Sequence, residues 1–92
     1  MDRSIWKFQL ETADYQTISM PKDAEILTVQ TQGDTPCLWA LVNPEAEKED
    51  RRFEVFGTGH EVPVDMGIMR EYVATYQLHG GSLIFHVFER TN

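Results

Sequence analysis

Short stretches of alternating apolar and polar residues recur along the chain, and this period of two is typical of β-strands with one buried face. The alternation is clearest near the start, where Trp6, Phe8 and Leu10 are separated by Lys7 and Gln9. Strands are predicted at residues 5–10, 16–20, 24–32, 37–42, 52–56, 71–78 and 82–89. The pattern therefore predicts a single all-β domain over residues 1–92, mainly antiparallel, folded as a small β-sandwich or barrel of six or seven strands with at most one short helical turn.

Two of these segments are the best marked. Residues 37–42 are apolar on both alternating faces, which indicates a central strand that is covered on both sides or whose outer face meets another surface. Residues 71–78 and 82–89 flank His79-Gly80-Gly81, and a Gly-Gly centre supplies the positive φ angles of a tight primed hairpin turn. The all-β prediction rests mainly on these two pieces.

The connecting segments carry weaker signals. Residues 43–47 have the order of a helix start, with a capping residue, a proline and then acids, but they are long enough for only one helical turn. Residues 45–52 mix acids with bases and are interpreted as a solvated loop that leads into the next strand. Residues 61–70 contain a proline and a glycine and are predicted to form a long loop, with room for a turn of helix at 66–69.

The balance of charges bears on the partners of the protein. Its 15 acidic residues against 8 basic ones give a formal net charge of −7. Because binding to a phosphate backbone is mostly electrostatic, direct binding to nucleic acid is disfavoured. The same charge favours a protein partner with a basic surface, although an acidic surface can also serve only to keep a domain in solution.

Cysteine usage and hydropathy indicate the compartment. Cys37 is the only cysteine, so no internal disulfide is expected, and it lies in an apolar run where an unreactive buried thiol is expected. The first residues lead into a strand pattern rather than a signal peptide, and no apolar run approaches the roughly 20 residues that span a bilayer. We therefore expect a cytoplasmic protein that does not insert into a membrane.

Gly57-Thr58-Gly59-His60 is the segment that most resembles a binding site. Its glycines would let the backbone approach a ligand, its amides could form a nest for an anion, and His60 could add a hydrogen bond or a proton. The structural alternative is a bulge or a sharp corner after a strand. Arg51 and Arg52 could clamp the phosphate of a nucleotide whose base stacks on an aromatic residue such as Trp39, or they could only balance the acids before them.

We find no catalytic or metal-binding signature in the sequence. The spacing from His79 to His86 matches no common zinc pattern, and the lone Cys37 cannot complete one, so no metal and no cofactor are predicted. His86 has apolar neighbours on its own side of the predicted strand and is expected to be hydrogen-bonded and half-buried. No nucleophile can be placed beside a base from the sequence, so we expect a protein that is not an enzyme.

Five segments carry a resemblance that extends over nearly the whole chain: IWKF (5–8), PKDAEIL (21–27), PCLWALV (36–42), FGTGH (56–60) and QLHGGSLIFHVFE (77–89). They resemble a family of small uncharacterised proteins from bacteria and their phages. The family has no established activity to transfer. What the resemblance implies is a small cytoplasmic protein, encoded by a phage, that acts inside a bacterial host.

Three hypotheses follow from these observations. The first is a non-enzymatic phage protein that binds a host protein with a basic surface and inhibits an anti-phage defence system. The second is a homo-oligomeric sponge that binds a small anionic nucleotide at residues 57–60, with positive charge supplied by Arg51, Arg52 and Arg70. The third is a phage structural or assembly protein that works by self-association.

Overall fold

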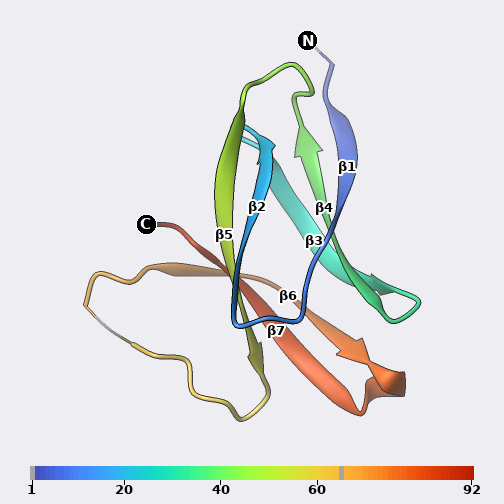
Figure 1. Ribbon diagram of the computed structural model, residues 1–92, viewed down its shortest axis with the longest axis vertical. Coiled ribbons are helices and arrows are strands. Elements are labelled where there is room, and N and C mark those ends of the chain that lie inside the picture. Colours follow the sequence, from blue (N-terminus) through green and yellow to red (C-terminus); the bar gives the residue numbers. More distant parts are fainter. Residues whose placement is uncertain (1, 65) are drawn as a thin grey trace.

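A computed structural model describes residues 2–64 and 66–92, and it confirms the all-β prediction (Figure 1). The described chain forms seven strands and one 3-10 turn, η1. The strands are β1 (Ser4–Gln9), β2 (Tyr15–Pro21), β3 (Glu25–Gln32), β4 (Thr35–Val42), β5 (Lys48–Gly57), β6 (Arg70–Leu78) and β7 (Leu83–Arg90), and η1 (His79–Gly81) joins the last two. Each predicted strand is present, most with ends that differ by one or two residues.

The strands form two antiparallel sheets. The first has the order β1-β4-β3 and the second the order β2-β5-β7-β6. The inner faces of the two sheets share one hydrophobic core, and β3 runs beside β6 where an edge of one sheet meets an edge of the other. The result is a flattened sandwich, whose Cα extents are 42 × 37 × 15 Å.

Strand β4 is the centre of the three-stranded sheet, as its doubly apolar pattern predicts. Leu38, Ala40 and Val42 point inward and are completely buried, while Cys37 is buried on the opposite face. The expectation of a buried thiol is therefore confirmed. Trp39 and Leu41 share the face of Cys37 but remain partly exposed, so the cover on this side is incomplete.

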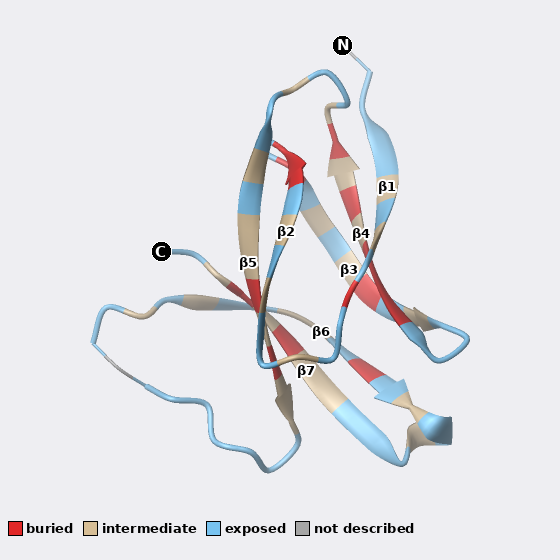
Figure 2. Ribbon diagram, viewed as in Figure 1, coloured by how far each residue is buried: buried red, intermediate tan, exposed pale blue. Residues whose placement is uncertain are grey.

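The core lies between the sheets and includes buried residues of β4, β5 and β7, whose buried segments are red in Figure 2. Each Å² of apolar surface that is buried contributes about 25 cal/mol to the stability of the fold, so this cluster is its main source of stability. Its buried members are Leu10, Met20, Ala24, Val29, Leu38, Ala40, Val42, Phe53, Val55, Tyr76 and Val87.

Strand β5 starts earlier than predicted, because Lys48–Arg51 pairs with β2 rather than forming a solvated loop. The segment was predicted to be a loop because its residues are charged, but in the strand their side chains alternate between the two faces of the sheet. Residues 43–47 form a turn and not a helix: the Ala46 amide donates to the Asn43 carbonyl oxygen at 3.1 Å, and the Glu45 amide donates to Asn43 Oδ1 at 3.1 Å.

The β6–β7 hairpin is present, but its connection is longer than a tight two-residue turn. Leu78 and Leu83 are the last paired residues, so four residues connect the strands. Positive φ angles occur at Gly80 (66°) and Gly81 (94°), as predicted, and also at His79 (51°). The only short helical turn in the described chain therefore lies here, and not at residues 43–47 or 66–69.

Candidate functional site

The face of the four-stranded sheet that points away from the core carries most of the candidate chemistry, and we call it the outer face. On β5 and β7, Phe53, Val55 and Val87 are buried in the core, so the residues between them point outward. The register of the strands then assigns to the outer face Tyr15, Thr17, Arg52, Glu54, Phe56, Arg70, Tyr72, Thr75, Ile84, His86, Phe88 and Arg90.

Three arginines form one row across the outer face. Arg52 on β5 is the cross-strand partner of Arg90 on β7, and Arg90 is in turn the partner of Arg70 on β6. Like charges directly opposite one another on a sheet are destabilising unless something neutralises them. The row therefore concentrates positive charge on one face of a chain whose net charge is −7.

Arg70 is neutralised within the chain. Its Nε donates to Glu54 Oε1 at 2.6 Å, and its Nη1 donates to the Pro63 carbonyl oxygen at 2.6 Å. Its guanidinium also lies over the Phe56 ring, 5.6 Å from the ring centre. This residue thus ties the long loop after β5 to the outer face.

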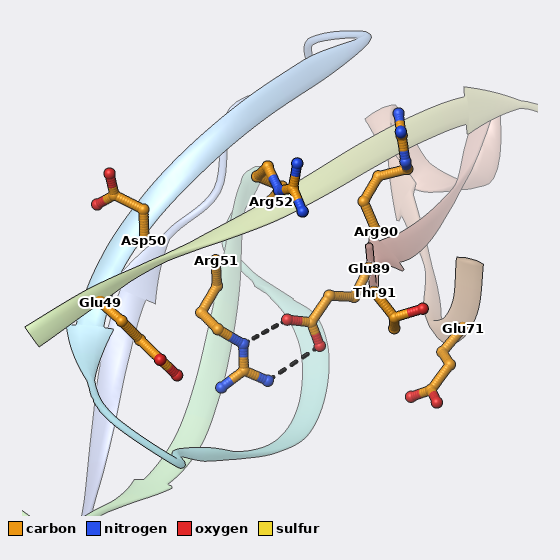
Figure 3. Close-up of a pocket in the computed structure, with 8 residues that line it drawn as sticks. All are labelled: Glu49, Asp50, Arg51, Arg52, Glu71, Glu89, Arg90 and Thr91. Atoms are coloured by element: carbon orange, nitrogen blue, oxygen red, sulfur yellow. Dashed lines mark hydrogen bonds and ion pairs between the residues drawn. The ribbon is translucent and has the colours of Figure 1, made fainter. Parts of the chain in front are cut away.

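Arg52 and Arg90 have no such partner. Within residues 2–64 and 66–92, no carboxylate lies within 4.0 Å of either guanidinium. The Nε of Arg90 is shielded from solvent and donates no hydrogen bond. Both side chains lie on one side of β5, opposite Arg51 and Glu89 (Figure 3).

An aromatic cluster adjoins the arginine row. Phe88 meets Phe56 edge to face with ring centres 5.8 Å apart, and it meets Tyr72 in the same way at 5.6 Å. Phe56 and Phe88 are partly buried, whereas Tyr72 is exposed. Aromatic rings next to arginines are common at the centres of binding surfaces.

His86 links three elements through side-chain hydroxyls. Its Nε2 lies 2.7 Å from Thr58 Oγ1 and its Nδ1 lies 2.9 Å from Thr75 Oγ1, which in turn lies 2.6 Å from the Tyr72 hydroxyl. A hydroxyl beside an imidazole is the start of a nucleophilic site, but here the second ring nitrogen meets a hydroxyl rather than an orienting carboxylate. The chain of hydrogen bonds acts as a brace between the start of the loop, β7 and β6.

Arg51 and Arg52 point to opposite faces of the sheet, so they cannot form one clamp. Arg51 points inward and binds Glu89 through Nε and through Nη2, the latter at 3.0 Å, and its Nη1 donates to the Ala24 carbonyl oxygen at 2.8 Å. The hydrogen bond to Glu89 is the main cause of the raised pKa of Arg51. The sequence suggested that the acids just before Arg51 balance its charge, but its ion-pair partner is Glu89 on β7.

The Gly57–His60 segment is a tight corner at the end of β5. The His60 amide donates to the Gly57 carbonyl oxygen at 3.0 Å, and the Thr58 amide donates to the Ile84 carbonyl oxygen at 3.2 Å. The His60 ring packs against Gly57, because a Cβ at that position would lie 2.9 Å from the ring. Two of the amides that an anion nest would need are therefore already hydrogen-bonded, one within the corner and one to β7.

The surface beside His60 is acidic. A depression of about 350 Å³ there is lined by residues that include Asp14, Glu54 and Glu61 but no arginine or lysine. A nucleotide phosphate needs positive potential. Of the three arginines considered for this role, Arg70 is already bound to Glu54.

Trp39 lies on the other sheet. It pairs with Lys7 of β1 and Thr28 of β3, and it points away from the core. The structure therefore divides the candidate residues among four places: Trp39 on the three-stranded sheet, residues 57–60 at the corner, Arg51 on the inner face of the four-stranded sheet, and Arg52 in the arginine row. Sequence analysis missed Arg90, whose position in the row depends on a strand pairing that no local pattern reveals.

Comparison with known families gives one match. A family described as a domain of unknown function, DUF7352, matches residues 1–92. The chain belongs to DUF7352. No curated protein and no solved structure matched it. The resemblance to an uncharacterised family is thus confirmed, and the DUF7352 match spans both sheets and the outer face.

Metal-binding clusters and membrane-spanning helices are both absent from the described residues of this DUF7352 domain. Within residues 2–64 and 66–92, no group of His, Cys, Asp or Glu side chains is arranged to hold a metal ion. No helix in the described part of the chain is both long and apolar enough to cross a membrane.

Proposed function

We propose that this chain is a non-enzymatic protein-binding module that binds through the loop between β5 and β6 (residues 58–64 and 66–69) and through the exposed apolar side chains of the four-stranded sheet, rather than through the arginine row. The observation that carries the proposal is the distribution of exposed large hydrophobic side chains. Most of them belong to the four-stranded sheet or to this loop, namely Tyr15, Val62, Val64, Met66, Met69, Tyr72, Leu83 and Ile84. Contiguous apolar surface with a polar rim is typical of protein interaction sites.

The charge of the chain favours a partner with a basic surface. The net charge of −7 would steer such a partner at long range, and at the surface its basic groups would meet Asp14 and Glu61, which line the depression beside His60 and Pro63 of the loop. Together with the resemblance to phage proteins, this supports a host protein as the partner. We propose a cytoplasmic role inside a bacterial host, as an inhibitor of an anti-phage defence system.

The test is affinity capture from bacterial lysate with the chain as bait, combined with salt titration and matched variants. Met69 and Ile5 are almost equally exposed, at 61% and 60%, but Met69 lies in the loop just before β6, whereas Ile5 lies on β1 of the three-stranded sheet. We expect Met69→Ser combined with Tyr72→Ala to abolish retention of the partner, and Ile5→Ser to leave it unchanged. Retention of no protein at low salt, or equal loss with Ile5→Ser, would overturn the proposal.

A further inference from the structure

We propose that Arg52 and Arg90 form a binding site for a small oxyanion such as inorganic phosphate. The two residues are directly opposed across β5 and β7. The site lies beside a groove of about 340 Å³ where β5 extends beyond the end of β7 (Figure 3). This inference does not depend on the proposed protein-binding function.

The first argument is the like-charge pair. Directly opposed residues on one face of a sheet have Cβ atoms about 4.5–5.5 Å apart, and two like charges at that distance repel. Arg70, the third member of the row, is neutralised by Glu54 at 2.6 Å. For Arg52 and Arg90, no described carboxylate within 4.0 Å performs that role. An oxyanion between the two guanidiniums would convert the repulsion into attraction.

The second argument is the unpaired Nε of Arg90. It is shielded from solvent and has no hydrogen-bond partner among the described residues. A buried donor left without a partner is unfavourable, and hydrogen bonds to charged groups are stronger than neutral ones. An anion that accepts from this Nε and from Arg52 would satisfy the donor. Guanidinium groups match the oxygen spacing of phosphate and carboxylate groups.

The acids around the groove limit the charge and size of the ligand. Glu49, Glu71 and Glu89 line the groove from the inner face, and Glu89 is occupied by Arg51, so among the groove residues only Asp50 shares the outer face with Arg52 and Arg90. Two guanidiniums against this one carboxylate leave a small positive charge, which suits a single compact oxyanion. We expect millimolar affinity for inorganic phosphate.

The test uses the side-chain Nε–H resonances of the arginines in a ¹⁵N-labelled chain. Inorganic phosphate is titrated against chloride at matched ionic strength and constant pH, with acetate as a second arm. We expect saturable shifts at Arg90 and Arg52 and none at Arg70. A response to phosphate alone assigns the site to tetrahedral oxyanions, whereas a response to both probes extends it to carboxylates. No saturable shift, or an equal shift at Arg70, would overturn the site.

A stability measurement gives an independent readout. In chloride, Arg52→Gln should raise Tm because it removes the like-charge repulsion, and it should abolish the increase in Tm that phosphate produces. Arg3→Gln removes the same charge from the exposed start of the chain and should retain the phosphate response. If Arg52→Gln kept the phosphate response, the assignment of the site would be wrong.

Discussion

Arg51 on β5 and Glu89 on β7 form a two-pronged ion pair on the inner face of the four-stranded sheet. The pair lies beside the hydrophobic core, and the same arginine donates to the Ala24 carbonyl oxygen just before β3. A residue of the four-stranded sheet thereby holds the segment that leads into the three-stranded sheet. The pair therefore links the two sheets where the core ends.

Removing one member of this pair should destabilise the fold. Breaking a fully buried pair costs about 3–5 kcal/mol, and the residual exposure of these side chains reduces the expected loss for Arg51→Met or Glu89→Leu to about 2–3 kcal/mol. Urea unfolding measures the change in the free energy of unfolding. The double variant Arg51→Met with Glu89→Leu should recover part of the loss, because neither charge then lacks a partner. A double variant that loses the sum of both single effects would contradict a coupled pair.

The stability of the protein should fall at alkaline pH because of Tyr76. Burial raises the pKa of its phenol above 10.0, against the opposing effect of its hydrogen bond with Thr12. The unfolded state therefore loses this proton first, and the free energy of unfolding should decrease as the pH rises through about 10 towards the folded-state pKa. Below the unfolded pKa the contribution is constant.

Thermal unfolding between about pH 8 and about pH 11 measures this alkaline decrease in stability. Tyr76→Phe removes the titrating group, and its stability should depend less on pH over this range. Tyr15 is exposed in the folded chain, so Tyr15→Phe serves as the control that keeps the wild-type slope. An identical slope in wild type and Tyr76→Phe would contradict the prediction.

Arg70→Lys should release the long loop from the outer face. A lysine cannot hold Glu54 through two nitrogens while it also donates to the Pro63 carbonyl oxygen, as Arg70 does. The lost charged hydrogen bonds correspond to about 1–3 kcal/mol of local stability. Limited proteolysis should then cut within residues 61–69 faster. Arg52→Lys is the control: it makes the same change in the arginine row, but Arg52 forms no ion pair with a described residue, so the cleavage rate should stay unchanged.

The two glycines of the corner after β5 should respond differently to alanine. Gly59 has φ +87° with open space around it, so Gly59→Ala introduces backbone strain of about 1–2 kcal/mol. Gly57 needs no positive φ, and a Cβ there meets only the ring of the exposed His60. We expect Gly57→Ala to displace this ring at little cost in stability. Calorimetry and the His60 ring resonances measure the two effects, and a larger loss of Tm for Gly57→Ala than for Gly59→Ala would be the contrary result.

The sequence by itself determined the strands and the centre of the first sheet. The period of two places Phe8, Leu10 and Val55 on faces that can be buried only against another layer, and the doubly apolar run of β4 requires a neighbour on each side. These features are local, because side-chain alternation and the positive φ of Gly80 and Gly81 depend on adjacent residues only. The one strand segment that the sequence pattern did not predict, Lys48–Arg51, is charged. Arg51 is partly buried there only because it pairs with Glu89, which lies far away in the sequence.

Only the tertiary structure decided which residues share a surface. Arg52, Arg70 and Arg90 are separated in the chain by more than a strand length, and they form one row because β5, β7 and β6 pair in a specific register. The same pairing sends Arg51 to the inner face and leaves Trp39 on the other sheet. A shift of one residue in register reverses every side chain. Local pattern therefore fixes the alternation along each strand, but the pairing of distant strands decides which charges and rings become neighbours.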